Sequence, residues 1–130
     1  MSFVQTALQM RGIRGAITAA GNTPNEISVA TDRLLREMVR ANELHVENIA
    51  AAFFTTTDDL TAEFPAVACR TLGWQLVALL CASEIAVPGS LRSCIRVLLL
   101  VNTMKEQAAI RHVYLDGAAT LRPDLAADQR

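Results

Sequence analysis

The segment CIRVLLLVNT, which runs from Cys94 to Thr103, decides the fold of this 130-residue chain. Successive side chains of a β-strand point to opposite faces of a sheet, and one of the two alternating sets in this segment is wholly apolar. That set consists of Ile95, Val97, Leu99 and Val101. We therefore predict a strand whose odd-numbered face belongs to the core. On the even-numbered face, Arg96 lies among Cys94, Leu98 and Leu100.

Four further segments are predicted to be strands, because each is an apolar or alternating run bounded by polar or turn residues. They are Met10–Thr18, Val46–Thr56, Trp74–Ala82 and Arg111–Leu115. The second of them contains the run IAAAFF, which predicts burial on both faces.

Helix signals are most complete near Thr23, which is a candidate N-cap followed by Pro24 at the first helical position. Glu26 completes a capping box, and apolar residues then recur at helical spacing. We predict a long helix over about residues 24–41 and a short one between Phe64 and Gly73.

Five strands, one long helix and one short helix predict an α/β (α+β) sandwich with a mixed sheet. A chain of 130 residues holds one core, so residues 1–130 are expected to form a single domain. The polar segment from about residue 122 to 130 is predicted to be a mobile tail. Two helices cover only one face of such a sheet, while the other face is still apolar. We therefore expect an oligomer in which the sheets of different subunits meet.

Composition excludes several classes of partner. The net charge is −1 and the isoelectric point is near 6.1, so no global field attracts nucleic acid or an acidic membrane. The longest uninterrupted apolar run, Leu76–Ala82, is too short to span a membrane, and no secretory signal is recognisable at the N-terminus.

The three cysteines, Cys69, Cys81 and Cys94, are an odd number without a CxxC pair. They predict buried free thiols in a reducing compartment, and hence a cytoplasmic protein, rather than disulfides or a zinc site. The sequence also lacks the familiar motifs for nucleotide cofactors, metals and activated serines. We therefore expect no metal and no cofactor.

The distribution of charge points to arginines as the candidate functional groups. Between Pro65 and Met104 the only acid is Glu84, and the first 25 residues contain Arg14 but no acid. Arg96 has two interpretations of equal weight: a structural ion pair or strand-edge residue, and a binding group whose rigid fork of donors suits carboxylates. Taken alone, Arg14 is slightly better explained as a solvated strand end. Together, these residues predict a site for a small anion rich in carboxylates.

Other residues have plain structural interpretations. Cys81 is expected to be a small core residue, because no histidine lies near it in sequence to activate it. Tyr114 is expected to be half-buried with its hydroxyl at the surface. Arg70 and Arg122 are expected on solvated faces.

Four segments resemble one enzyme family, in the family's order and from about Met10 to Leu125. They are RGIRGAIT, DLTAEFPAVACR, CASEIAVPGSLRSCIRVLLLVNT and IRHVYLDGAATLRPDL. In these segments the chain resembles the monofunctional AroH-class chorismate mutases.

The resemblance implies a pseudo-α/β-barrel homotrimer with active sites at the subunit interfaces. It implies conversion of chorismate to prephenate, in the pathway to phenylalanine and tyrosine. This reaction is a unimolecular Claisen rearrangement and needs no nucleophile, metal or cofactor.

The resemblance also implies roles for single residues. Arg14 corresponds to an arginine that holds a carboxylate, and Arg96 to the arginine that faces the breaking ether bond. Glu84 is expected to accept a hydrogen bond from the substrate hydroxyl and to orient Arg96, and Tyr114 is expected to donate to a carboxylate.

The remaining substrate contacts come from three places in the chain. One group surrounds the ring, a second is contributed by the neighbouring subunit, and a third belongs to a tail that closes over the ligand. In that order they are Leu80, Cys81, Ala82 and Ser83; Phe64 and Arg70; and Leu121 and Arg122. Two positions depart from the family: Val67 replaces a frequent lysine, and Leu80 replaces a frequent threonine.

Two other classes of function are weighed against this one. Small trimeric proteins that resemble the enamine/imine deaminase family share a related architecture, so the chain is alternatively a deaminase or a small-carboxylate-binding module. A purely structural oligomerisation domain is the third possibility. The combination of Glu84, Arg96 and Tyr114 favours the mutase.

Overall fold

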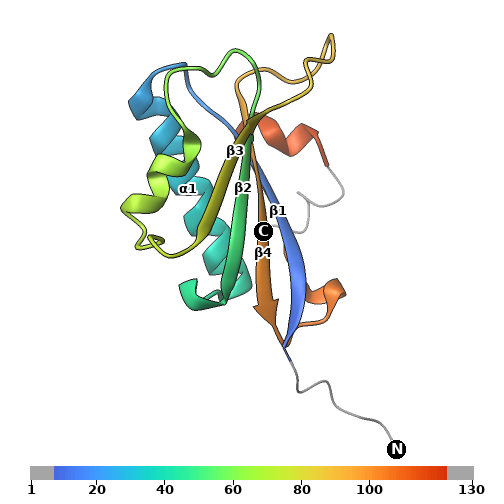
Figure 1. Cartoon of the computed structure of the whole chain (residues 1–130). Helices are drawn as coiled ribbons and strands as arrows, with labels where there is room; N and C mark the ends of the chain where they lie inside the picture. The colour runs from blue at the N-terminus through green and yellow to red at the C-terminus, as the bar shows by residue number, and fades with distance from the viewer. Residues whose placement is uncertain (1–7, 123–130) are drawn as a thin grey trace, which may run out of the picture.

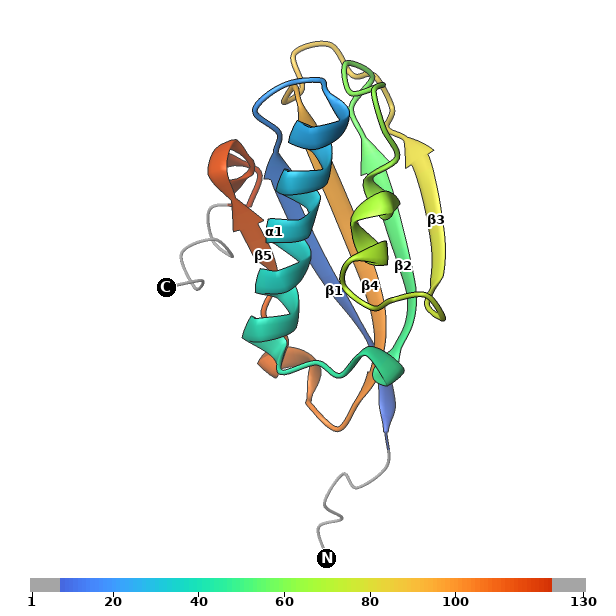
Figure 2. The same ribbon diagram turned by 90° about the vertical axis from the view of Figure 1, so that its left-hand side faces the viewer.

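Strand β4, which spans Cys94–Thr103, is the middle strand of a five-stranded sheet with the order β3-β2-β4-β1-β5. Strands β1 (Gln9–Thr18) and β2 (Ile49–Thr56) flank β4 and run antiparallel to it. The edge strands β3 (Ala78–Ser83) and β5 (Val113–Leu115) run parallel to β2 and β1, respectively. The sheet is therefore mixed, as predicted (Figures 1 and 2).

The structure is a computed structural model that describes residues 8–122. Residues 123–130, which make up most of the predicted mobile tail, lie outside the described residues. Within that range, no helix is long and apolar enough to cross a membrane.

Helix α1 spans Pro24–Asn42 and begins as the sequence predicts. The Thr23 hydroxyl oxygen accepts a hydrogen bond from the Glu26 backbone N–H at 3.1 Å, and the same hydroxyl donates to the Glu26 carboxylate at 3.0 Å. The helix ends at Glu43, which adopts the left-handed conformation with φ 53°. Capping at both ends thus fixes the length of this helix.

The predicted short helix is η2, a 3₁₀ helix over Pro65–Arg70. Further single-turn 3₁₀ segments occur at Val46–Asn48 (η1), Gln107–Ala109 (η3) and Asp116–Thr120 (η4). Residues 46–48 therefore do not belong to β2, contrary to the sequence prediction.

The prediction of a strand from Trp74 was also wrong at its first residues, because β3 begins at Ala78. The preceding residues form turns, in which the Trp74 N–H donates to the Cys69 carbonyl and the Val77 N–H donates to the Trp74 carbonyl. Leu76 is fully exposed there, so the apolar run reflects composition rather than burial.

Helices α1 and η2 lie on the same face of the sheet, as Figure 2 shows. Ile13 and Ile17 of β1 pack there with Leu34 and Met38 of α1, all of them almost completely buried. A Cβ atom at Gly15 would collide with the Met38 sulfur. Glycine at this position is therefore what allows α1 to lie so close to β1.

Among the described residues, no long helix covers the opposite face of β2, β4 and β3 (Figure 1). Leu98 is 37% exposed and Leu80 is 59% exposed in the single chain. Phe53 is only half-buried, so the prediction that both faces of β2 are buried does not hold within one chain. The expected uncovered apolar face is present.

Candidate active site

One row of side chains crosses the sheet on the face opposite α1 and η2. The pairing of β2 with β4 places Thr55 opposite Arg96, and the pairing of β1 with β4 places Ala16 opposite Arg96. The pairing of β1 with β5 then places Tyr114 opposite Ala16. Arg14 lies two residues before Ala16 on β1 and therefore points to the same face. Strand register alone gathers residues that are far apart in sequence.

These side chains line a cavity of about 440 Å³ on that face. Five of the predicted site residues contribute to its wall: Arg14, Arg96, Tyr114, Leu121 and Arg122. The wall is completed by residues that the sequence analysis did not single out as site residues: Gly15, Ala16, Phe53, Thr55, Val97 and Leu98. The small side chain at Ala16 leaves room beside the two strand arginines.

Arg96 is oriented by a carboxylate. Its Nε lies 3.1 Å from Oε1 of Glu84, whose side chain is 15% exposed, whereas the Arg96 side chain is 44% exposed. The other carboxylate oxygen of Glu84 accepts a hydrogen bond from the Thr55 hydroxyl at 2.9 Å. Glu84 is thus held from two sides, and it in turn fixes the guanidinium at the cavity wall.

The two arginines of this part of the chain, Arg92 and Arg96, have different partners. Glu84 pairs with Arg96, while Arg92 pairs with Asp58 at 2.5 Å. Arg96 therefore has its structural partner, yet it also lines the cavity.

Arg14 is held by its backbone rather than by its side chain. Its N–H donates to Nδ1 of His112 at 2.9 Å, at the point where β5 has not yet begun. Burial, together with the charges of Arg14 and Arg122, lowers the pKa of His112 below its usual value. The imidazole is therefore neutral at pH 7, which leaves Nδ1 able to accept this hydrogen bond.

Tyr114 reaches the cavity from β5, and Leu121 and Arg122 reach it after η4. Tyr114 is almost fully buried and packs with Ala16, Cys94 and Ala118. The Leu121 N–H donates to the Ala118 carbonyl at 3.0 Å, which turns the chain back toward the sheet. Leu121 and Arg122 thereby reach the cavity wall, and no local sequence pattern predicts this turn.

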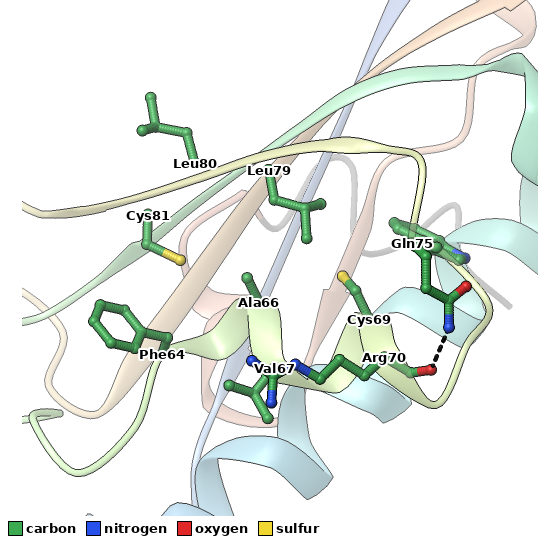
Figure 3. Close-up of a pocket in the computed structure, with 10 residues that line it drawn as sticks. Phe64, Ala66, Val67, Cys69, Arg70, Gln75, Leu79, Leu80 and Cys81 are labelled. Atoms are coloured by element: carbon green, nitrogen blue, oxygen red, sulfur yellow. Dashed lines mark hydrogen bonds between the residues drawn. The ribbon is translucent and has the colours of Figure 1, made fainter.

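The other predicted site residues lie elsewhere. Phe64, Arg70, Leu80 and Cys81 line a separate cavity of about 530 Å³ between η2 and the edge strand β3 (Figure 3). In Figure 3 the Leu80 side chain points away from the side of β3 on which Leu79 and Cys81 face η2. Val67, the position where the family often has lysine, is part of the same wall.

Ala82 and Ser83 belong to a third cavity of about 420 Å³, which also includes Phe64 and Cys81. Within the described chain, the predicted site residues therefore form two groups. One group lies around Arg96 on the face opposite α1, and the other lies along β3 and η2.

The structure offers no activated thiol at the two buried cysteines. Burial raises the pKa of Cys69 to about 12 and that of Cys94 to about 11, so both remain protonated at neutral pH. Among residues 8–122, no cluster of three histidine, cysteine, aspartate or glutamate side chains could hold a metal ion. The chemistry that the first cavity offers is fixed positive charge beside hydrogen-bond donors.

Comparison with known proteins gives a consistent result. Residues 10–125 match the family described as chorismate mutase type I. The chain is 52% identical over 121 residues to the chorismate mutase AroH of Thermus thermophilus, covering 92% of this chain and 99% of the relative. It is 43% identical over 120 residues to the chorismate mutase AroH of Bacillus subtilis (strain 168), covering 92% and 94%.

A solved structure, that of a chorismate mutase from Clostridium thermocellum, superimposes with a TM-score of 0.83 at 50% identity. The match covers 84% of this chain and 97% of that chain. Sequence and fold therefore agree over nearly the whole length. The chain belongs to the type I chorismate mutase family, isomerases that convert chorismate to prephenate in the biosynthesis of aromatic amino acids.

Proposed function

We propose that this protein rearranges chorismate to prephenate in a cleft that two subunits of a homotrimer build together. The observation that carries the proposal is Arg96, which lines an otherwise largely apolar cavity while Glu84 fixes its guanidinium at 3.1 Å. The reaction is intramolecular: one carbon–oxygen ether bond breaks as one carbon–carbon bond forms, and no atom is gained or lost.

Arg96 supplies the electrostatic part of catalysis. Negative charge grows on the ether oxygen as its bond to carbon breaks, and a fixed guanidinium stabilises that oxygen more in the transition state than in the ground state. Because Glu84 already holds the guanidinium, little reorganisation is needed when the charge develops.

Arg14 and Tyr114 supply the binding part. Both line the cavity with Arg96, and chorismate carries two carboxylates and one hydroxyl. Arg14 pairs with a carboxylate, Tyr114 donates a hydrogen bond to a carboxylate, and Glu84 accepts one from the hydroxyl. Together they select a compact conformer in which the reacting carbons are close.

A neighbouring subunit supplies the second wall. Phe64, Arg70 and the segment 80–83 line cavities away from the Arg96 cavity, so they do not surround the same ligand within one chain. Strand β3 is an edge strand with exposed side chains on both faces. In a trimer, this edge packs against the uncovered sheet face of the next subunit, and both apolar surfaces are buried.

Leu121 and Arg122 close the cleft from the side of Tyr114. Both lie on the wall of the Arg96 cavity, where Arg122 adds a further positive charge to attract the substrate's carboxylates. The hydrophobic Val67 in place of lysine removes an attraction at the rim and is expected to weaken substrate binding rather than to slow the chemical step.

The test combines an activity assay with a measurement of assembly. Purified protein is expected to consume chorismate, followed by the loss of its absorbance, and to sediment with the mass of a trimer. Failure to consume chorismate would refute the function, and a monomeric mass in an active enzyme would refute the shared cleft.

Mixing two inactive variants tests the shared cleft directly. Arg96→Ala disables the sheet face and Arg70→Ala disables the edge, so a randomly mixed trimer has about a quarter of its sites intact. Activity in the re-associated mixture is expected to rise well above the mean of the two variants. If the active site lies within one chain, mixing leaves activity at that mean. The two variants kept apart under identical refolding conditions are the control.

A further inference from the structure

We propose that Asp59 is a positioning residue for Arg96, which acts by holding Ser93 in a left-handed backbone conformation at the start of β4. This inference rests on the proposed catalytic role of Arg96. Asp59 lines none of the three cavities described above, so any effect on the reaction has to pass through other residues.

The carboxylate of Asp59 is bound from several directions. The Ser93 backbone N–H donates to it at 2.9 and 3.2 Å, and the Ser93 hydroxyl donates at 3.2 Å. The Thr57 hydroxyl donates to its Oδ1 at 2.5 Å, and the Nε of Arg92 lies 3.7 Å from its Oδ2. One side chain therefore joins the end of β2 to the residue that precedes β4.

Ser93 requires stabilising hydrogen bonds of this kind because its φ is 54°. L-residues other than glycine seldom adopt this region, in which the Cβ atom crowds the backbone. When such a conformation persists, its surroundings over-determine it. Here the determining group is Asp59, since both donors of Ser93 are directed at one carboxylate.

Ser93 sets the path of the chain into the catalytic strand. The Ser93 carbonyl accepts a hydrogen bond from Ala19 at 2.8 Å, and the next residue, Cys94, is the first of β4. The Cys94 N–H donates to the Thr57 hydroxyl oxygen, and its carbonyl accepts from the Thr57 N–H, each at 3.0 Å. Arg96 follows two residues later.

The hydrogen bonds among Thr57, Asp59, Ser93 and Cys94, here called the clamp, also fix the partners of Arg96. Thr57 directly follows β2, whose Thr55 is paired with Arg96 and donates to Glu84. Glu84 begins the loop that ends at Ser93, and its N–H donates to the Thr56 carbonyl at 2.9 Å. Glu84 lies at the start of this loop, and Asp59 fixes its end by binding Ser93.

The carboxyl group of Asp59 is ionised, as its role as a hydrogen-bond acceptor for Ser93 requires. Partial burial acts to raise its pKa, but the hydrogen bonds from Thr57 and Ser93 and the charge of Arg92 outweigh burial and keep the pKa below its usual value. The group is an ionised acceptor at neutral pH, which a neutral amide of the same shape cannot fully replace.

Three variants test the proposal: Asp59→Asn, Ser93→Gly and the double variant. Asp59→Asn is expected to lower kcat about tenfold with KM nearly unchanged, since a small misplacement of a catalytic group slows the chemical step. Glycine adopts positive φ without a supporting carboxylate. The double variant is therefore expected to recover most of the kcat of Ser93→Gly alone.

A control separates positioning from loss of stability. Thr31→Ala removes a fully buried side chain on α1, away from this clamp, and lowers the melting temperature without changing kcat well below it. An Asp59→Asn enzyme that is folded and keeps its kcat within about twofold would overturn the proposal. So would a loss of kcat that Ser93→Gly does not restore.

The two proposals fail separately. If Arg96→Ala leaves turnover intact, the proposed catalytic role of Arg96 is wrong. If Arg96→Ala abolishes turnover while Asp59→Asn does not change it, only the positioning role of Asp59 is wrong.

Discussion

Arg96 and Arg14 lie on the same face of the sheet and line one cavity, but they are held in different ways. Arg96 is fixed through its side chain, which forms an ion pair with the half-buried carboxylate of Glu84. Arg14 is fixed through its backbone N–H, which donates to His112, and no carboxylate among residues 8–122 lies within ion-pair distance of its guanidinium.

The difference separates positioning from binding. The charge of Arg96 is already partly compensated, so this residue is better suited to stabilise charge that appears during the reaction than to attract the substrate. Within residues 8–122 the charge of Arg14 has no carboxylate partner, which suits it to bind a substrate carboxylate equally in the ground state and the transition state. Substitutions at the two sites are therefore expected to affect different kinetic constants.

The largest effect is expected from Arg96→Ala, which should lower kcat by at least ~10²–10³ because it deletes a preorganised donor. Arg96→Lys should recover only part of the loss, since a point charge lacks the planar fork. Steady-state kinetics with chorismate measures both. Arg36→Ala, which removes an exposed arginine of α1, is the matched control and should not change kcat. Retention of most turnover in Arg96→Ala would exclude the catalytic assignment.

Arg14→Ala is expected to have a smaller effect, and to change KM rather than kcat. KM should rise about ten- to a hundredfold, because a hydrogen bond to a charged group contributes about 1.5–3 kcal/mol. The value of kcat at saturating chorismate should change much less. A fall in kcat with unchanged KM would reverse the comparison and make Arg14 the residue that acts on the transition state.

Thr55→Val probes the support of Glu84 rather than Arg96 itself. Loss of the hydroxyl that donates to Glu84 at 2.9 Å should lower kcat about fivefold, corresponding to a net hydrogen-bond contribution of about 1 kcal/mol. Thr56→Val removes the neighbouring hydroxyl on the opposite face of β2 and is the control. Equal kinetics for the two variants would mean that the Glu84 carboxylate needs no support from β2.

The part of the site that could be predicted from sequence is the part that alternation reveals. CIRVLLLVNT predicts both the strand and its two faces, and the structure confirms β4 with the same bounds, Cys94–Thr103. Glu84 is the only acid between Pro65 and Met104, and the family resemblance implies that it orients Arg96. The family resemblance, rather than periodicity, pointed to Tyr114 as a substrate contact.

The residues that sequence reasoning missed depend on strand pairing. Thr55 reaches Glu84, the partner of Arg96, because β2 pairs with β4. His112 reaches the Arg14 N–H because β5, which begins one residue later, pairs with β1. No local pattern encodes such a register. Asp116–Thr120 likewise has no helical period, so η4 and its effect on Leu121 were not predicted.

The smallest expected effect concerns the hydrogen bond that holds Arg14. Burial lowers the pKa of His112 from 6.5, so between the two pKa values the unfolded chain binds more protons than the folded one. His112 therefore contributes stability that is fully present above pH 6.5 and is lost as the pH falls through its folded pKa.

His112→Asn tests this sign, because the asparagine carbonyl can accept the Arg14 N–H without titrating. Melting temperatures measured between pH 8 and pH 5 should fall more steeply for the natural chain than for His112→Asn, in a window above the range in which carboxylates titrate. His45→Asn, which removes the other histidine, is the control. If the melting temperature of His112→Asn depends on pH as steeply as that of the natural chain, the neutral imidazole of His112 is not what holds Arg14. Arg14 would then owe its position to the pairing of β1 with β4 alone.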